Sequence, residues 1–205
     1  MSQNVKTSKG QIISGSTGRR RLVVGISGAS GAILGIRMLE VLRVMENIET
    51  HLVISPAACM TITQETDWQV SDVLALADVV YKHQDISASI ASGSFDTSGM
   101  VVIPCSIKTL SAVANSYTDN LLSRAADVTL KEGRPLIMVV REAPLHRGHL
   151  RLMDQAAEAG AVIFPPVPTF YSRPASLDEM IDNIVGRVLA RVGIENDQYF
   201  KWKGS

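Results

Sequence analysis

The segment Arg21–Ala32 constrains the fold of this chain most strongly, because it joins a buried strand directly to a loop of very small residues. Val23, Val24 and Ile26 form the short apolar run that is typical of a parallel strand covered on both faces. The loop Gly28–Gly31 lets the backbone approach a ligand closely, and the positive end of the following helix is directed at that ligand. This combination predicts a cradle for an anion, most often a phosphate.

The glycines of this segment lie at positions 25, 28 and 31, which gives the spacing G-x-x-G-x-x-G. A dinucleotide-binding loop has the spacing G-x-G-x-x-G, so the pattern argues against a standard NAD site and leaves a mononucleotide such as FMN open. Glycine and serine also build ordinary tight turns, so Ser30 has a purely structural alternative.

The composition is that of one globular domain. The chain has 205 residues, of which 46% are hydrophobic, enough to bury a sizeable core. Twenty basic residues balance twenty acidic ones, so no overall field favours nucleic acid or an anionic membrane. No apolar run approaches the roughly 20 residues that span a bilayer. Two cysteines imply neither a disulfide framework nor a zinc site, and we expect a cytoplasmic protein.

Apolar strands and amphipathic helices alternate along the chain. We expect a disordered polar leader over residues 1–20 and a single domain over residues 21–205. After the first strand, further strands are predicted at 50–55, 99–105, 135–141 and 161–164, and helices at about 33–45, 57–66, 109–115, 119–131, 149–159 and 177–192. This alternation predicts an α/β fold with a doubly wound, mainly parallel sheet, a flavodoxin-like, Rossmann-type three-layer sandwich. Residues 67–98 are the least regular region, expected to form a lid or a subunit contact.

Ligands of such a sheet bind beyond the carboxyl ends of its strands. Small, hydroxyl-bearing or charged residues follow four of the predicted strands: Gly28–Ser30, Ser55, Ser106–Thr109, and Arg141 with Glu142. A phosphorylated ligand needs residues of these types, so their convergence at one edge is a better indication than any single motif.

Five blocks at these positions resemble the UbiX-type flavin prenyltransferases: Gly25–Ala32, Pro104–Leu110, Arg124–Asp127, Arg141–Pro144 and Phe170–Tyr171. They follow in family order between about Arg21 and Trp202. The resemblance implies a flavin-binding domain that assembles into a homododecamer. It also implies transfer of a dimethylallyl group from dimethylallyl phosphate to N5 and C6 of reduced FMN. The product, prenylated FMN, would serve a UbiD-type decarboxylase in ubiquinone biosynthesis or aromatic acid metabolism.

The resemblance also assigns residues. FMN contacts fall on the following: Gly28, Ala29, Ser30, Ser55, Ser106, Ile107, Lys108, Thr109, Arg124 and Arg141. The residues that would hold dimethylallyl phosphate are Lys131, Tyr171 and Arg187, and the catalytic residues would be Glu142, Ser30 and Lys131. Some family members place a Trp against the prenyl chain where this chain has Ile86.

These residue types suit the chemistry. A monophosphate is a poor leaving group unless its developing charge is neutralised, and the cations Lys131, Arg141 and Arg187 with a tyrosine hydroxyl do this without a metal. An allylic cation must be shielded from water, which favours a pocket closed by a subunit interface. The second bond, to C6, requires loss of a ring proton, and the Glu142 carboxylate is suited to mediate it.

Structural alternatives exist for several of these residues. Lys131 ends a predicted helix, where a cation favourably meets the helix dipole. Arg187 lies on an amphipathic helix, where a solvated arginine is usual. Arg141 and Glu142 also fit an ion pair that fixes a loop.

Three residues outside the resemblance have the types of a metal ligand or a nucleophile. His146 and His149 lie at i, i+3, like a metal-binding pair, but no third ligand is near in sequence. Cys105 at a strand end resembles a nucleophile, and a small buried residue fits that position as well.

Two other functions compete with prenyl transfer. FMN-dependent decarboxylases that act on cysteine-bearing substrates use a histidine soon after the first βα loop, and the helix after Gly31 contains none. A non-catalytic FMN-binding subunit of a decarboxylase complex would not need Lys131, Glu142, Tyr171 and Arg187 together, and all four are present. The enzyme is therefore favoured.

Overall fold

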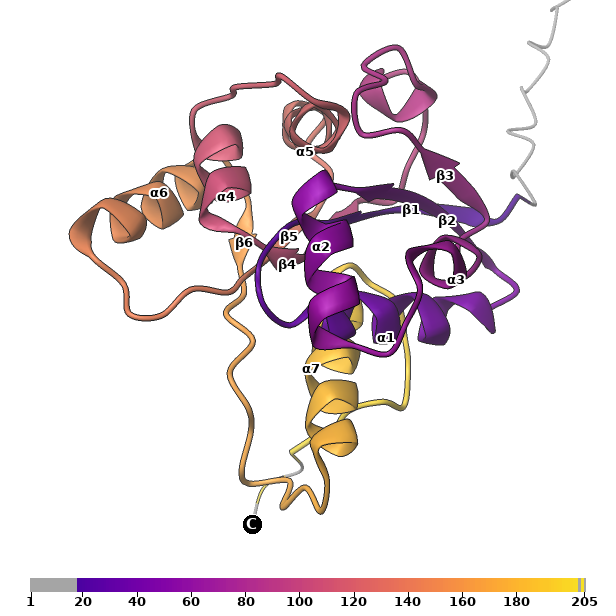
Figure 1. The fold of residues 1–205 in the computed structure, drawn as a ribbon, viewed down its shortest axis with the longest axis vertical. Helices are drawn as coiled ribbons and strands as arrows, with labels where there is room; N and C mark the ends of the chain where they lie inside the picture. The colour runs from indigo at the N-terminus through magenta and orange to yellow at the C-terminus, as the bar shows by residue number, and fades with distance from the viewer. Residues whose placement is uncertain (1–17, 203, 205) are drawn as a thin grey trace, which may run out of the picture.

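The computed structural model describes residues 18–202 and 204, and its centre is a sheet of six strands (Figure 1). The strands are β1 (Arg20–Ile26), β2 (Ile48–Ile54), β3 (Val79–Tyr81), β4 (Met100–Cys105), β5 (Leu136–Val140) and β6 (Val162–Ile163). Neighbours in the order β3-β2-β1-β4-β5-β6 all pair in parallel. The predicted α/β class with a parallel sheet is thus confirmed.

The strand order reverses between β1 and β4, because β2 and β3 lie on one side of β1 while β4, β5 and β6 lie on the other. Without β3, the five strands expected from the sequence have the flavodoxin-like order 2-1-3-4-5. The register places Val24 of β1 between Leu52 of β2 and Val101 of β4. Ligands of open α/β sheets bind at such a reversal, beyond the carboxyl ends of the strands, so the topology itself positions the site.

The segment 67–98 is more regular than its sequence suggests. It contains the helix α3 (Val70–Leu74), the edge strand β3 and the 3-10 turn η1 (Ser89–Ala91). Asp78 fixes the start of β3, because its carboxylate accepts the N–H and the O–H of Thr50 at 2.8 and 2.9 Å. A strand of three residues is too short to show a recognisable alternation, which is why the sequence did not predict it.

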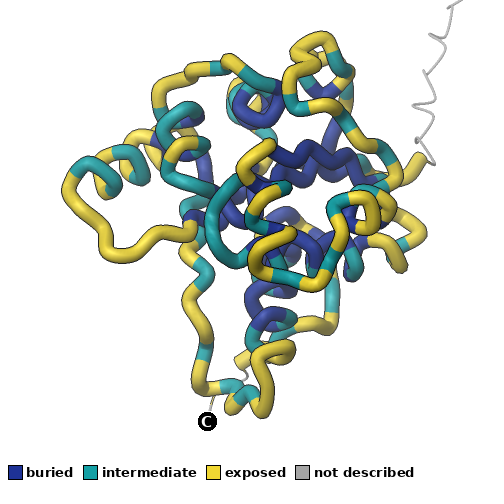
Figure 2. The backbone as a smooth tube through the Cα atoms, viewed as in Figure 1, coloured by how far each residue is buried: buried dark blue, intermediate teal, exposed yellow. Residues whose placement is uncertain are grey.

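Helices cover both faces of the sheet. Those packed on one face are α1 (Ala32–Arg43), α2 (Pro56–Glu65) and α7 (Leu177–Arg191), and those on the other are α4 (Ile107–Ala114), α5 (Leu121–Lys131) and α6 (Arg147–Glu158). Alternate residues of β4 pack against the two helical layers. Val101 and Ile103 belong to the core on the side of α1, α2 and α7, and Met100 and Val102 belong to the core on the other side. Figure 2 shows the strands as the buried centre of this three-layer sandwich.

The first strand begins one residue earlier than expected. β1 starts at Arg20, and Arg19 donates from Nη1 to Oδ1 of Asp78 at 2.9 Å, so both residues contact the sheet. Of the expected disordered leader, residues 1–17 lie outside the described residues. Among residues 18–202 and 204, no helix has both the length and the apolar character that crossing a membrane requires.

A long loop, residues 164–176, leaves the body of the domain between β6 and α7 (Figure 1). Near its tip the Tyr171 ring packs against those of Phe200 and Trp202, at centroid distances of 6.0 and 5.7 Å. Phe170 beside it is 71% exposed and Trp202 is 62% exposed. We call Phe170, Tyr171, Phe200 and Trp202 the aromatic arm. A grouped apolar surface of this kind marks a protein contact.

Candidate functional site

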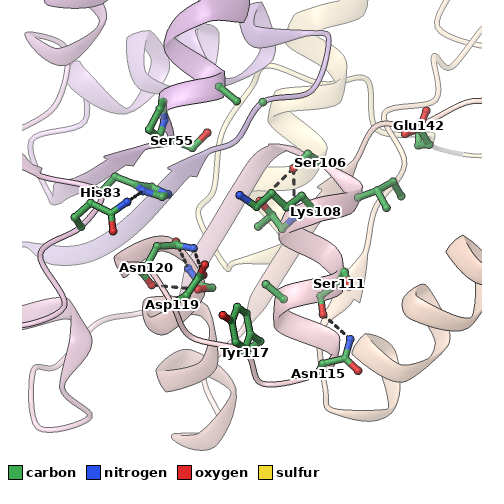
Figure 3. A pocket seen from close by; sticks show the side chains of 18 residues that line it. Ser55, His83, Ser106, Lys108, Ser111, Asn115, Tyr117, Asp119, Asn120 and Glu142 are labelled. Carbon is green, nitrogen blue, oxygen red and sulfur yellow. Dashed lines mark hydrogen bonds between the residues drawn. The ribbon is translucent and has the colours of Figure 1, made fainter.

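A cleft of about 1010 Å³ lies at the carboxyl edge of the sheet (Figure 3). Each strand from β1 to β5 places a residue in its wall just past its own end: Gly28, Ser55, His83, Ser106 and Glu142. The cleft therefore spans the reversal of strand order between β1 and β4. Its volume is at the upper end of the range for small-molecule sites, enough for a mononucleotide and a second small substrate.

Three helices begin at the wall of this cleft, and α2 and α4 are the two that serine hydroxyls cap there. Ser55 caps α2 by accepting the N–H of Ala58 at 3.1 Å, and Ser106 caps α4 by accepting the N–H of Thr109 at 3.3 Å. The positive ends of both helix dipoles consequently face the same space, where they favour an anion. Lys108, on the first turn of α4, adds a side-chain cation to the same wall.

The end of β1 is tied to the end of β4 beneath the cleft. The buried Ser27 accepts the N–H of Ser106 on Oγ at 2.8 Å and donates its own hydroxyl proton to the carbonyl oxygen of Pro104 at 3.1 Å. Gly28 follows directly, and a Cβ atom built there would lie 2.3 Å from Cβ of Ala57. Only glycine therefore lets this loop lie against the first turn of α2.

The N-terminus of α1 differs from the predicted anion cradle. The Glu65 carboxylate, at the end of α2, accepts the N–H of Gly31 at 2.8 Å and that of Ala32 at 3.4 Å. A negative charge of the protein itself thus occupies the position where a phosphate was expected. Ala29 and Ser30 are partly exposed and do not line the cleft. The helix N-termini whose capping residues line the cleft are those of α2, α4 and α5.

The cleft brings together about half of the residues expected at the site: Gly28, Ser55, Ser106, Ile107, Lys108, Thr109 and Glu142. Glu142 is exposed, and its Oε1 accepts the N–H of Ala143 at 3.0 Å. Arg141 is exposed next to it, outside the wall of the cleft, and its N–H donates to the carbonyl oxygen of Cys105 at 3.1 Å. In the part of the chain that the structure describes, no ion pair joins Arg141 to Glu142.

The other expected residues lie away from the cleft of their own chain. Arg124 donates from Nε to the carbonyl oxygen of Ala91 at 3.2 Å and from Nη1 to Asp127 at 3.1 Å, which ties α5 to η1. Lys131 ends α5, roughly 15 Å from the start of that helix at 1.5 Å per residue, where it pairs with Glu132.

The two remaining candidates for phosphate binding are also remote from the cleft. Tyr171 belongs to the aromatic arm, and Arg187 lies on α7 with its guanidinium 5.6 Å from the centroid of the Phe164 ring. One chain therefore does not unite the three residues Lys131, Tyr171 and Arg187 with the cleft.

The wall opposite α4 contains polar residues that sequence reasoning missed. They come from the segment after β3 and from the connection between α4 and α5: His83, Gln84, Tyr117, Asp119 and Asn120. The carbonyl oxygen of His83 accepts the N–H of Leu121 at 2.8 Å, which joins the two segments. Partial burial lowers the pKa of His83, the Lys108 ammonium lowers it too, and Asp119 opposes them. Burial thus disfavours the protonated form of His83, whose side chain lines the cleft. The residue could have been found from the sequence only by recognising the short strand β3 that precedes it.

The structure decides between the alternatives for Cys105. Its side chain is fully buried, and this burial raises the pKa of the thiol far above its ordinary value. A buried thiol of this kind is inert, so Cys105 is a packing residue. Among the described residues, no three His, Cys, Asp or Glu side chains are grouped as a set of metal ligands.

Comparison with known proteins agrees with this geometry. A model of the family described as Flavoprotein matches residues 11–189. The flavin prenyltransferase UbiX of Escherichia coli strain K12 is 61% identical over 188 residues, which cover 91% of this chain and 100% of that protein. A crystal structure of AnUbiX (PadA1) in complex with FMN and dimethylallyl pyrophosphate matches with a TM-score of 0.89 and 50% identity, and the match covers 91% of this chain and 99% of that one. A dodecameric FMN-dependent UbiX-like decarboxylase from Escherichia coli O157:H7 matches with a TM-score of 0.87 and 47% identity, over 90% of this chain and 100% of that one.

Proposed function

Because this chain belongs to the flavoprotein family and, within it, to the UbiX-type flavin prenyltransferases, we propose that it transfers a dimethylallyl group to reduced FMN. The observation that carries the proposal is the cleft where five strand ends and the N-termini of α2 and α4 meet. Identity of 61% to a flavin prenyltransferase makes an FMN-dependent cysteine decarboxylase or a non-catalytic FMN subunit the less favoured alternative. Bound FMN supplies the nucleophilic ring that accepts the prenyl group.

The phosphate of FMN belongs, in this proposal, between the starts of α2 and α4. Ser55, Ser106 and Thr109 bring hydroxyl groups there, and Lys108 brings a positive charge. The first turn of α1 is less favoured for the phosphate, because Glu65 accepts the N–H groups of Gly31 and Ala32. Gly28, the residue of this loop that lines the cleft, would then lie beside the flavin, where the lack of a side chain allows close approach.

Glu142 takes the role of the proton-transfer group. It lies past the end of β5 and lines the same cleft as Ser106 (Figure 3). Its carboxylate is exposed and, among the described residues, accepts a hydrogen bond from the N–H of Ala143 alone, so rotation of the side chain would free it to accept a proton from the ring. This assignment requires a carboxylate and not merely a polar group of the same shape.

Neighbouring copies of the chain complete the site. Lys131, Tyr171 and Arg187 would neutralise the leaving phosphate, yet all three lie away from the cleft of their own chain. The exposed aromatic arm provides a contact surface that would bring Tyr171 to another copy. A relative of this chain is dodecameric, and we propose the same closed assembly here. Closure also shields the allylic cation from water.

The test is incubation of the protein with reduced FMN and dimethylallyl phosphate under anaerobic conditions, followed by mass spectrometry of the released flavin. We expect the flavin to gain one five-carbon unit, and excess chelator to leave the rate unchanged because cationic side chains neutralise the phosphate. Dimethylallyl pyrophosphate in a parallel reaction decides which donor is used. A flavin of unchanged mass with both donors would overturn the proposal, and turnover that chelator abolishes and magnesium restores would overturn its metal-free form.

The product, prenylated FMN, would pass to a UbiD-type decarboxylase in the cytoplasm, in ubiquinone biosynthesis or in aromatic acid metabolism. Its chemistry supports this step, because a modified flavin released from a transferase has use only in a second enzyme. The test adds the filtered reaction product to such a decarboxylase purified without cofactor. We expect only the product of the complete reaction to activate the decarboxylase. Activation of the decarboxylase by unmodified FMN would contradict the proposed transfer of prenylated FMN between the two enzymes.

A further inference from the structure

A second cavity, of about 530 Å³, lies between α4 and α6. It shares the start of α4 with the flavin cleft, but its other wall is formed by α6, which takes no part in that cleft. The side chains that carry its chemistry are His146, His149, Arg151 and Gln155 from α6 with Lys108 and Ser111 from α4. The prenyl-transfer proposal gives this cavity no role.

The lining is basic and contains hydrogen-bond donors but no carboxylate. Arg151 is exposed and has no ion-pair partner in the part of the chain that the structure describes. By contrast, Arg37 on α1 is held by the carboxylates of Asp178 and Asp182 at 2.8 and 2.6 Å. The guanidinium of Arg151 is therefore available for a planar, two-point contact with an external anion.

The two histidines that line this cavity offer further donors. His146 caps α6, because its Nδ1 accepts the N–H of Gly148 at 2.9 Å. The proton of that neutral ring is consequently on Nε2, which leaves Nε2–H as a donor. The His149 ring lies against it at a centroid distance of 3.6 Å, tilted by 35°. Its Nδ1 is buried and has no hydrogen-bond partner among the described residues, which leaves Nε2 as the ring nitrogen for a ligand. Both rings lie at the positive end of α6.

We propose that the cavity between α4 and α6 is an anion site for a phosphate group, separate from the flavin cleft. One guanidinium, two imidazoles and an amide offer several donors to one small volume, which suits an anion with three or four acceptor oxygens. The phosphate can be free inorganic phosphate or the end of a small phosphate monoester. This assignment stands on the α4–α6 geometry and not on the activity of the flavin cleft.

Titration calorimetry on the FMN-loaded protein tests the site, because bound FMN keeps phosphate out of the flavin cleft. Phosphate that binds instead to the proposed donor site of Lys131, Tyr171 and Arg187 is recognised because its affinity does not depend on Arg151. Inorganic phosphate and methyl phosphate are titrated separately into wild type, Arg151→Gln and the control Arg43→Gln. Arg43 is an exposed arginine at the end of α1 with no ion-pair partner among the described residues, so its variant loses the same charge at a remote position. Circular dichroism and FMN content verify that each variant is folded and loaded.

We expect saturable binding to wild type and Arg43→Gln, and binding about tenfold weaker or more in Arg151→Gln, as loss of a charged hydrogen bond predicts. Tighter binding of inorganic phosphate assigns the site to free phosphate, and tighter binding of methyl phosphate assigns it to a monoester. Absence of binding to wild type overturns the proposal. Equal affinity in Arg151→Gln and Arg43→Gln also overturns it.

Discussion

At the scale of single residues, the size of the effect of substituting Glu142 distinguishes a chemical role of this residue from a structural one. An exposed ion pair contributes about 0–1 kcal/mol to stability, whereas a proton-transfer group contributes on the order of 100- to 10,000-fold in rate. We predict that Glu142→Gln folds and binds FMN but forms product about 100-fold more slowly or worse. Product formation is followed by chromatography of the released flavin. Glu46→Gln, which removes an exposed carboxylate remote from the cleft, is the control. A near wild-type rate in Glu142→Gln would make Glu142 structural.

His51 makes the stability of the domain depend on pH. Its ring is buried, with Nε2 2.7 Å from Glu49 and Nδ1 2.8 Å from the hydroxyl of Tyr81. Burial lowers the pKa of His51 below its ordinary value of 6.5, although Glu49 opposes the shift. The unfolded chain therefore binds a proton at a higher pH than the folded one, so the free energy of unfolding falls as pH drops below 6.5.

We predict that the free energy of unfolding of His51→Gln falls less with decreasing pH, because glutamine cannot become protonated. Urea denaturation at a series of pH values measures it. The pH range of the His51 effect can be separated from that of Glu49. His51 and Arg21 lower the pKa of the Glu49 carboxyl below 4.5, so the contribution of Glu49 to stability is lost only at more acidic pH. Equal slopes of wild type and His51→Gln between pH 6.5 and 4.5 would refute the role of His51.

At the scale of elements, the capping of α1 allows a test of where the flavin phosphate is proposed to bind. Glu65 satisfies two N–H groups of the first turn of α1, and loss of such a cap costs about 0.5–2 kcal/mol. We predict that Glu65→Ala lowers the free energy of unfolding by about 1 kcal/mol and leaves FMN affinity unchanged. Denaturant titration and flavin fluorescence measure the two quantities. If the phosphate lay over the start of α1, removing this carboxylate would instead tighten FMN binding.

The elements that the sequence predicts well are those with a strong local signal. β1, β2, β4 and β5 contain runs of β-branched or apolar residues, and their carboxyl ends carry the residues that line the cleft. β3 has only three residues, so its pattern is too short to detect, and His83 after it was missed for the same reason. The cap from Glu65 to α1 joins residues 34 positions apart, a contact that no local pattern reveals.

At the scale of the whole molecule, the expected site residues of one chain lie in separate places, which indicates that more than one copy of the chain forms the site. Glu142 lines the cleft of its own chain, whereas Arg187 lies on α7 beside Phe164. Sequence resemblance names both residues but does not say which copy of the chain supplies each one. In a closed symmetric assembly every copy has the same neighbours, so the cleft of each chain can contact the surface of a neighbour that contains Arg187.

The most direct test of a site shared between copies of the chain is complementation between two inactive variants. Glu142→Gln and Arg187→Ala are co-expressed with different affinity tags, and doubly tagged assemblies are purified and assayed for prenylated flavin. If the cleft and the phosphate-binding arginine come from different copies, random assembly restores about a quarter of wild-type turnover. If both residues act within one chain, every chain carries one defect, and the mixed assemblies stay as inactive as either variant alone.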